Sequence, residues 1–554
     1  MTRLTGSATL LRLLVDEGVT HVFGNPGTTE LAIMADLPLF PGLKYVLGLQ
    51  EAVVVAMADA YARASGRLAA ANVHVAPGLG NAMGALYGAN FAGAPIIVTA
   101  GQQDQGHGLL EPILSGNLVQ MAQPVTKWAV EATRVVDLPR IVRRAAKVAL
   151  TPPTGPVFIS LPADVLAAEA DVDIGQRVRV DFRNRPSAQT LEKMASMLLA
   201  ANRPVMIVGQ EISARDAIAE AASVAELLGA AVYQQTMPST AQFYSEHPAH
   251  MGPLGRNQKR VRAALEPYDL ILCVGADLLR MSLASELEPL PGGVPVLHVS
   301  ERPWELGKNY RTDLAIQADV GETLRELLPV LRARADSSYR AKAGQRLAGL
   351  KPINWSSRRD KAAVEAMAAA ETRPIDARFF ALRLSQALPR NATVVEEAAT
   401  TMEALLTFTP MRDRASFFGL TSGALGFGLP WAVGVSLALP GRPVAAIIGD
   451  GSSLYALPAL WTAAHLRVPV TIVIVNNRSY RVLKERLVSW RNSHSFVGMD
   501  LHDPAIDFVG LGKALGLPAM RVTEPQDLDG ALRAGFESGA PNLIEVRIAD
   551  GFGE

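Results

Sequence analysis

Two short polar segments carry the strongest chemical signal in this chain, because each directly follows an apolar run. Gly449-Asp450-Gly451-Ser452 follows one run, and Asn476-Asn477 follows the next. If both runs are strands of one parallel sheet, both segments lie at its carboxyl edge, where open α/β sheets bind ligands. A hard cation such as Mg²⁺ takes oxygen ligands, which the Asp450 carboxylate, the Asn477 amide and the Ser479 carbonyl would supply.

The two glycines of the first segment add a place for an anion. Gly449 and Gly451 let the backbone approach a phosphate closely, and a helix predicted to follow them offers its positive end. The pattern therefore predicts a metal-bound diphosphate. Asp-Gly and Asn-Asn are each common in turns, so only their pairing behind two strands is specific.

The elements that must position these residues follow an α/β pattern. Apolar, β-branched runs alternate with helical patterns almost throughout, which is typical of parallel sheets covered by helices. The 554 residues exceed what one core supports, and we predict three parallel-sheet domains at 1–180, 186–340 and 360–554. The predicted strands are 19–23, 44–47, 70–74, 95–99, 156–160, 205–208, 231–233, 270–274, 294–299, 393–395, 444–448, 470–475 and 543–546. The charged stretch 342–361 is predicted to link the second domain to the third.

Composition excludes several classes of protein. Lys plus Arg and Asp plus Glu number 53 each, without a basic stripe, so nucleic acid is not an expected partner. One cysteine, Cys273, cannot form an internal disulfide, and charged residues interrupt the amino-terminal apolar stretch, so we expect a cytoplasmic protein. The uncharged stretches 68–103 and 415–441 are predicted to be buried, because glycines and a proline make the second a poor membrane span.

The segment from Gly449 to Asn477, GDGSSLYALPALWTAAHLRVPVTIVIVNN, resembles the motif of thiamine diphosphate-dependent enzymes that begins GDG and ends NN. The resemblance spans nearly the whole chain. It implies a pyrimidine-binding domain, a Rossmann-like middle domain and a diphosphate-binding domain, with thiamine diphosphate and Mg²⁺ as cofactors. It also implies a homo-oligomer, a dimer of dimers in which each active site lies between subunits. Thr400, Gly451, Ser452 and Tyr480 are the coenzyme contacts expected from this match.

Two further segments match the coenzyme site of this superfamily. Glu51, in LQEAVVVAMADAYAR, resembles the glutamate placed against the aminopyrimidine ring, where a carboxyl favours the imino tautomer that generates the carbanion. An isolated glutamate in the first turn of a helix is more often a solvated residue that stabilises the helix dipole. TSGALGFGLPWAVG resembles the loop that bends the coenzyme, so that Gly423 offers its carbonyl and Leu425 is an apolar wedge.

The segments FGNPGTTE, NVHVAPGLGNAMGAL and VTAGQQ resemble the benzoylformate decarboxylase branch. This resemblance implies decarboxylation of a 2-keto acid, with aldehyde carboligation as a side activity. His74 matches a catalytic histidine, and Thr28 stands in place of a serine that holds the substrate carboxylate. Ile113 and Leu114 keep the aliphatic wall of the substrate pocket.

Three positions depart from the pattern of that branch. Ser282 falls where the second catalytic histidine is expected. Gly419 and Arg486 replace aromatic side chains of the pocket, so Gly419 should enlarge it and Arg486 could meet a second anionic group of the substrate. Arg486 could also be a surface charge on its helix.

Other functions stay open at this point. An acetolactate synthase-like carboligase would use the same coenzyme and metal. A non-catalytic protein that binds the coenzyme should have lost Glu51, which is present. A nicotinamide oxidoreductase would need the glycine-rich G-x-G-x-x-G fingerprint, which the strand ends of the second domain lack.

Overall fold

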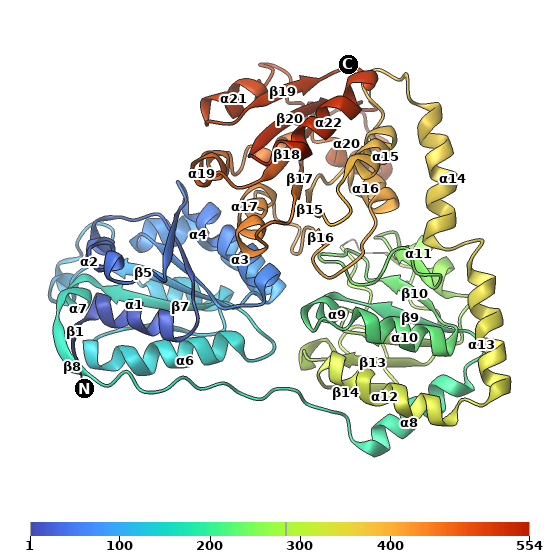
Figure 1. The fold of residues 1–554 in the computed structure, drawn as a ribbon, viewed down its shortest axis with the longest axis horizontal. Coiled ribbons are helices and arrows are strands. Elements are labelled where there is room, and N and C mark those ends of the chain that lie inside the picture. Colours follow the sequence, from blue (N-terminus) through green and yellow to red (C-terminus); the bar gives the residue numbers. More distant parts are fainter. Residues whose placement is uncertain (1, 283–284, 553–554) are drawn as a thin grey trace. The chain divides into compact units, whose positions relative to one another are not determined.

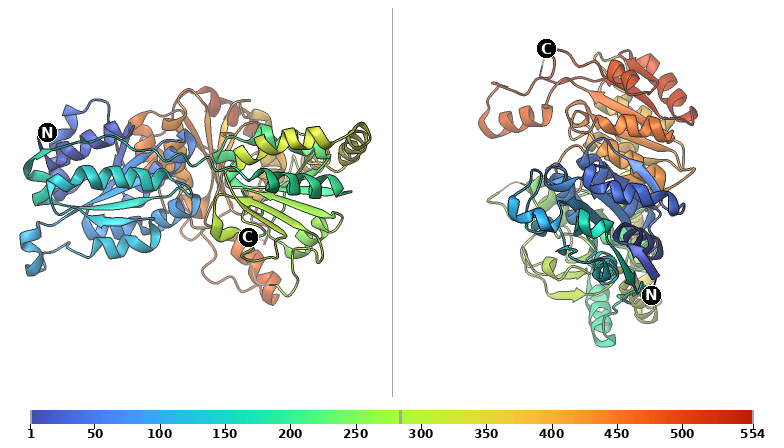
Figure 2. Two further views of the ribbon diagram at one scale, coloured as in Figure 1. Left: turned by 90° about the horizontal axis from the view of Figure 1, so that it is seen from below. Right: turned by 90° about the vertical axis from the view of Figure 1, so that its left-hand side faces the viewer.

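The computed structural model describes residues 2–282 and 285–552, and the chain divides into two compact units. Unit 1 combines 1–181 with 421–521 and 534–546, and unit 2 combines 182–420 with 522–533 and 547–554. The third predicted domain therefore contributes to both units. In each unit, helices cover the faces of parallel sheets (Figures 1 and 2), so the predicted α/β class is confirmed.

The amino-terminal part of unit 1 contains a six-stranded parallel sheet in the order β3-β2-β4-β5-β7-β6. Its strands are β2 (His21–Gly24), β3 (Lys44–Leu47), β4 (Ala69–Val73), β5 (Ile96–Gln102), β6 (Ala129–Glu131) and β7 (Val157–Pro162). From the neighbouring strands β2 and β4 the chain continues to opposite sides, to β3 and to β5. The carboxyl ends of β2 and β4 thus form a topological switch point, where such sheets bind ligands.

The remaining strands of unit 1 repeat part of this topology. β17 (Val444–Gly449), β18 (Val470–Asn476), β19 (Ala519–Val522) and β20 (Asn542–Arg547) lie in the order β17-β18-β20-β19, which parallels β4-β5-β7-β6. Gly449 of β17 is the partner of Val475 on β18, so the two polar segments leave adjacent strands at the same edge. An antiparallel pair, β1 (Thr2–Thr5) with β8 (Glu169–Val172), was not predicted.

Unit 2 contains the middle sheet, which has the order β11-β10-β9-β12-β13-β14 with parallel pairing. Its strands are β9 (Pro204–Val208), β10 (Ala231–Gln234), β11 (His250–Pro253), β12 (Leu270–Val274), β13 (Val296–Ser300) and β14 (Leu314–Gln317). At the ends of β9 and β12 the backbones almost touch, because a Cβ at Gly209 would lie 2.2 Å from the Gly275 carbonyl oxygen. Unit 2 also holds the parallel pair β15 (Thr393–Glu397) and β16 (Phe417–Phe418).

The stretch 342–361, predicted as a charged linker, is helical over most of its length. It belongs to α13 (Ser337–Leu350) and α14 (Trp355–Ala368). Asp336 and Asn354 cap the two helices by accepting backbone N–H groups of their first turns. Trp355 is buried and donates its indole N–H to the Leu406 carbonyl at 3.0 Å, which anchors α14 within unit 2.

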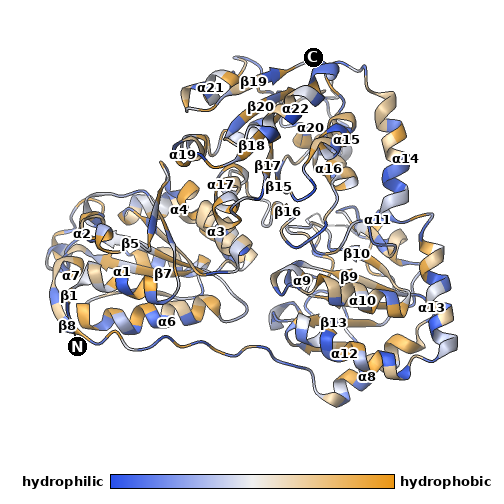
Figure 3. Ribbon diagram, in the orientation of Figure 1, coloured by the Kyte–Doolittle hydropathy of each residue, from blue (hydrophilic) through white to orange (hydrophobic). Residues whose placement is uncertain are grey.

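The two uncharged stretches fold into buried elements rather than membrane spans. Residues 68–103 include β4, α4 (Val75–Ala92) and β5, and 415–441 include β16 and α17 (Gly428–Ala438). In unit 1, α17 packs on α3 (Glu51–Ser65), where Gly434 permits contact with the Met57 carbonyl and Trp431 donates to Asp59 at 3.0 Å. Figure 3 shows apolar residues along the strands and the helices that cover them. Among the described residues, no helix has the length and apolarity that crossing a membrane requires.

Candidate active site

Glu51 begins α3 but does not cap it. Gln50 takes that role, because its side-chain oxygen accepts the backbone N–H groups of Ala52 and Val53 at 2.7 and 3.1 Å. Glu51 is only 7% exposed. A solvated first-turn glutamate is therefore the wrong interpretation of this residue, and its carboxylate is available for other partners.

Those partners come from the switch point and from the next helix. Asn25, directly after β2, donates its amide to Oε1 of Glu51 at 3.1 Å, and Asn81 on α4 donates to Oε2 at 3.0 Å. The backbone of α4 passes close by, since a Cβ at Gly78 would lie 3.2 Å from Oε1. The buried carboxylate is thus fixed between β2 and α4.

His74 follows β4 on the other side of the switch point and pairs with Glu30. The two atoms His74 Nδ1 and Glu30 Oε2 are 2.8 Å apart, and Glu30 is fully buried. Because a carboxylate only accepts hydrogen bonds, Nδ1 is the donor in this pair, and Nε2 is the ring nitrogen left for other partners. His74 can therefore exchange protons through Nε2.

Glu30 is itself held from several sides. It accepts N–H groups from Gly27 and Gly101 at 2.9 and 2.8 Å and the Thr29 hydroxyl at 2.9 Å. The short 3-10 helix η1 (Thr28–Glu30) carries both Glu30 and Thr28. Thr28 is exposed at the start of η1, so the structure brings Thr28 and His74 to one edge of the sheet through Glu30.

The predicted metal ligands lie together at the ends of β17 and β18. Asp450 and Asn477 are 4% and 7% exposed. Asp450 accepts the N–H of Gly451 at Oδ1 (2.8 Å) and that of Arg478 at Oδ2 (2.6 Å), which orients the carboxylate. Arg478 has the left-handed φ of 60°, and Asn477 Oδ1 accepts the N–H of Ser479 at 3.0 Å. The Asp450 carboxylate is thus held against the tight turn that contains Asn477 and Ser479.

This donor set fits Mg²⁺, because every predicted ligand is an oxygen atom, which is the donor type that a hard cation prefers. Within 2–282 and 285–552, no group of three or more His, Cys, Asp or Glu side chains could hold a metal ion. The Asp450, Asn477 and Ser479 set is of a different composition and stays a prediction.

The residues predicted to contact the coenzyme differ in burial and in their neighbours. A Cβ at Gly451 would lie 2.5 Å from Cε1 of Tyr480, so the Tyr480 ring itself requires glycine there. Ser452 is buried in the one-turn helix α18 (Asp450–Ser453). Gly423 has the left-handed φ of 79° with open space beside it, and Leu425 is half-buried. Thr400 is half-buried and belongs to unit 2.

The predicted substrate wall lies on a loop that two glutamines hold. Ile113 and Leu114 are 85% and 39% exposed. Gln103 donates its side-chain amide to the Ile113 carbonyl at 3.0 Å, and Gln102 donates to that of Gly116 at 2.8 Å. The apolar side chains are therefore presented on an anchored loop.

The departures from the family pattern fall in both units. Arg486 is half-buried on α20 (Arg481–Arg491) in unit 1, and the described part of the chain provides no hydrogen bond or ion pair to it. Ser282 is exposed in unit 2. Gly419, also in unit 2, was expected to enlarge the pocket, but it does not face open space. A Cβ there would lie 2.7 Å from Cε1 of Phe417, whose ring fills that side.

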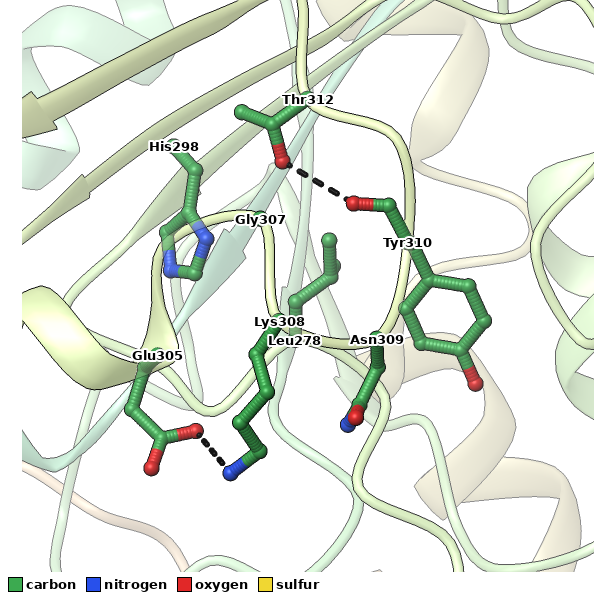
Figure 4. A pocket seen from close by; sticks show the side chains of 8 residues that line it. All are labelled: Leu278, His298, Glu305, Gly307, Lys308, Asn309, Tyr310 and Thr312. Atoms are coloured by element: carbon green, nitrogen blue, oxygen red, sulfur yellow. Dashed lines mark hydrogen bonds and ion pairs between the residues drawn. The ribbon is translucent and has the colours of Figure 1, made fainter.

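A small separate pocket lies in the middle domain. Glu305 and Lys308 pair at 2.9 Å in its lining, and Figure 4 shows His298 beside Glu305. The lining residues are Leu278, His298, Glu305, Gly307, Lys308, Asn309, Tyr310 and Thr312. None of the residues predicted for the coenzyme or substrate is among them.

Comparisons with known proteins match three parts of the chain to domains of one family. The thiamine pyrophosphate enzyme N-terminal TPP binding domain matches residues 4–119, the central domain 191–327 and the C-terminal TPP binding domain 399–546. Benzoylformate decarboxylase of Pseudomonas aeruginosa is 33% identical, over 96% of this chain and 97% of that protein. The Rhodococcus jostii RHA1 thiamine diphosphate-dependent 4-hydroxybenzoylformate decarboxylase structure is 32% identical, with a TM-score of 0.87 over 99% of each chain.

A more distant relative performs different chemistry. Acetolactate synthase isozyme 3 large subunit of Escherichia coli is 26% identical, over 98% of this chain and 94% of that protein. The chain belongs to the thiamine pyrophosphate enzyme family, and it is similar to members of the benzoylformate decarboxylase branch. It is therefore a thiamine diphosphate-dependent enzyme, as the sequence motifs predict.

Three residues of the site were missed by the sequence analysis. Glu30, Asn25 and Asn81 all lie inside the segments that resemble the benzoylformate decarboxylase branch. The position of Asn25 directly after β2 was a usable signal, since the carboxyl ends of strands at a switch point converge, whereas Glu30 lies on η1 and Asn81 within α4.

Proposed function

We propose that this protein is a 2-keto acid decarboxylase that uses thiamine diphosphate and Mg²⁺. The observation that carries the proposal is the His74–Glu30 pair, which supplies a proton-transferring group at the edge of the sheet where Glu51 also lies. The similarity to two decarboxylases of aryl 2-keto acids over nearly the whole chain supports it.

The metal and coenzyme have defined places in this proposal. Asp450, Asn477 and the Ser479 carbonyl would hold Mg²⁺ at the diphosphate, with Gly451, Ser452, Tyr480 and Thr400 as coenzyme contacts. When bound, thiamine diphosphate would supply a carbanion as nucleophile for the keto carbon and a cationic thiazolium ring as acceptor for the electron pair that carbon dioxide leaves behind. Gly423 and Leu425 would support the bent coenzyme.

The chain's own residues would then bind the substrate and move protons. The buried Glu51 carboxylate would hydrogen-bond the aminopyrimidine nitrogen and hold a proton there. Thr28, exposed on η1, would donate its hydroxyl to the substrate carboxylate. His74, with its lone pair at Nε2, would take up and return protons at the substrate oxygen and carbon.

The substrate class follows from the pocket residues. Ile113 and Leu114 offer an apolar wall, which suits an aryl or branched side chain. Arg486 lies half-buried without a carboxylate partner among the residues that the structure describes, which favours a substrate with a second anionic group. Benzoylformate has only one anionic group, so Arg486 is the residue that would favour a substrate with two such groups over benzoylformate.

The assembly is also part of the proposal. The exposed Ile113 and Leu114 would be covered in a homo-oligomer, a dimer of dimers with each active site between subunits. We place the enzyme in the cytoplasm, where the free, buried Cys273 stays reduced.

An acetolactate synthase-like carboligase is the second candidate, because the E. coli relative aligns over nearly the whole chain. A decarboxylase could also join aldehydes as a side activity. The experiment is to supply purified protein with thiamine diphosphate, Mg²⁺ and a panel of aromatic, branched and dicarboxylic 2-keto acids, and to measure carbon dioxide release. We expect release from at least one class, and no release from any of them would refute the proposal.

A further inference from the structure

The carboxylate of Glu51 is held by one side-chain amide on each oxygen. Asn25 donates to Oε1 at 3.1 Å and Asn81 donates to Oε2 at 3.0 Å. The two amides come from different elements, one from the end of β2 and one from α4. Glu51 has three rotatable side-chain bonds, and two opposed donors leave it one orientation.

The two amides differ in their surroundings. Asn25 is half-buried at the switch point, whereas Asn81 is exposed on α4 although it binds a carboxylate that is 7% exposed. Asn81 therefore lies between the Glu51 oxygen and the outside of unit 1. Gly78, one turn before Asn81, keeps the α4 backbone against Glu51, since a Cβ there would lie 3.2 Å from Oε1.

The arrangement leaves Glu51 able to bind a further donor. An ionised carboxylate has about four acceptor positions, so the two amides leave about two free. The pair thus orients Glu51 without blocking it.

We propose that Asn81 is a positioning residue for Glu51, which it aims at the aminopyrimidine ring while Asn25 holds the other oxygen. This inference rests on the role proposed above for Glu51. It concerns how the coenzyme is bound and activated, so it applies whichever 2-keto acid is the substrate.

The test uses the full-length protein freed of coenzyme and metal, then titrated with thiamine diphosphate in excess Mg²⁺. We expect Asn81→Ala to weaken coenzyme binding about tenfold and to slow exchange of the thiazolium proton about tenfold, since one hydrogen bond to a charged group is lost. Asn81→Asp has the same shape but opposes one carboxylate with another, and we expect a loss of about a hundredfold.

Three comparisons separate positioning from a general structural role. The unfolding temperature of the coenzyme-free protein should not change in the Asn81 variants, because the side chain is exposed. Asn81→Gln keeps an amide donor and should retain most of the coenzyme affinity. Asn90→Ala on the same helix, whose side chain lies near Gly155, should match the unaltered protein.

The outcomes distinguish this inference from the proposed function. If Glu51→Gln slows proton exchange by orders of magnitude but Asn81→Ala and Asn81→Asp do not, Asn81 has no positioning role and the proposed function stands. If Glu51→Gln leaves the exchange rate unchanged, the role of Glu51 is refuted and the positioning role of Asn81 is refuted with it.

Discussion

Nδ1 of His74 lies 2.8 Å from Oε2 of the fully buried Glu30, and two backbone N–H groups and a threonine hydroxyl hold the same carboxylate. The pair fixes which nitrogen of His74 carries the proton. In the proposed reaction, Glu30 thereby leaves Nε2 as the nitrogen that transfers the proton.

Glu30→Gln should therefore impair proton transfer. The amide can donate to Nδ1, which favours the tautomer with the proton on Nε2, and we expect kcat to fall by about 10²–10⁴. Coenzyme affinity should not change. Steady-state kinetics checks this, with Glu131→Gln as the control, since Glu131 lies in the same sheet and its carboxylate accepts the Ser160 hydroxyl. A kcat within twofold of the unaltered enzyme would contradict the role of Glu30.

Glu396 should make the stability of the protein depend on pH. Burial raises the pKa of Glu396 from 4.5 to about 7, and Oε2 has no hydrogen-bond partner in the described part of the chain. In the unfolded chain this glutamate has the ordinary pKa of 4.5, so it ionises at a lower pH than it does in the folded protein. The contribution of Glu396 to the free energy of unfolding is therefore complete below about pH 4.5 and is lost as the pH rises through 7.

Glu396→Gln should remove this dependence. Between pH 5 and pH 8, the unaltered protein should lose roughly 2–3 kcal/mol of unfolding free energy relative to the variant, by the conversion of pKa shifts into free energy. Thermal unfolding of the coenzyme-free protein across this range measures it. Glu403→Gln, at an exposed glutamate, should follow the unaltered protein. Parallel curves for Glu396→Gln would mean that Glu396 does not titrate in this range.

Asp450→Ala should abolish activity at ordinary Mg²⁺ concentrations. The carboxylate is the charged member of the proposed ligand set, and its loss should weaken metal binding by about a hundredfold or more. A chelator should inactivate the unaltered enzyme, and Mg²⁺ should restore it. Asp507→Ala serves as the control, because Asp507 pairs with Arg521 at 2.8 Å on the surface of the same unit. Full activity of Asp450→Ala would remove the proposed metal site.

Arg486→Leu should change substrate preference. If Arg486 binds a second anionic group of the substrate, its loss should lower kcat/KM for a dicarboxylic 2-keto acid about a hundredfold, roughly 2.7 kcal/mol. An aryl substrate without that group should be unaffected. Arg491→Leu is the matched control on the same helix, because the Arg491 guanidinium lies over the Trp490 ring. Equal losses for both substrates would make Arg486 a surface charge.

Much of the fold could be predicted because buried strands are short apolar runs with polar boundaries. Two of them, Lys44–Leu47 and Leu270–Val274, have the predicted bounds. β16 was missed because it has only two residues, Phe417 and Phe418, which lie in a glycine-rich segment and pair with β15 and with Thr240. The helices α13 and α14 were missed because charged residues obscure the apolar pattern, although Trp355 anchors the second of them.

The site residues that could be predicted are those that lie directly after a strand in the sequence. Asp450 and Asn477 directly follow their strands, and the parallel pairing of β17 with β18 brings both to one edge. Glu30 and Asn81 act over separations of 44 and 30 residues, which only the folded sheet and α4 create. The sequence pattern also could not show that the Phe417 ring fills the space beside Gly419.

The ratio of free aldehyde to carbon dioxide tests the central claim most directly. The purified enzyme would be supplied with thiamine diphosphate, Mg²⁺ and the 2-keto acid that releases carbon dioxide fastest, and both products would be quantified over time. A decarboxylase returns a proton to the intermediate, so we predict one aldehyde for each carbon dioxide. Release of one carbon dioxide for every two molecules of 2-keto acid consumed, with a 2-hydroxy-3-keto acid in place of the aldehyde, would contradict the proposal and identify the enzyme as a carboligase.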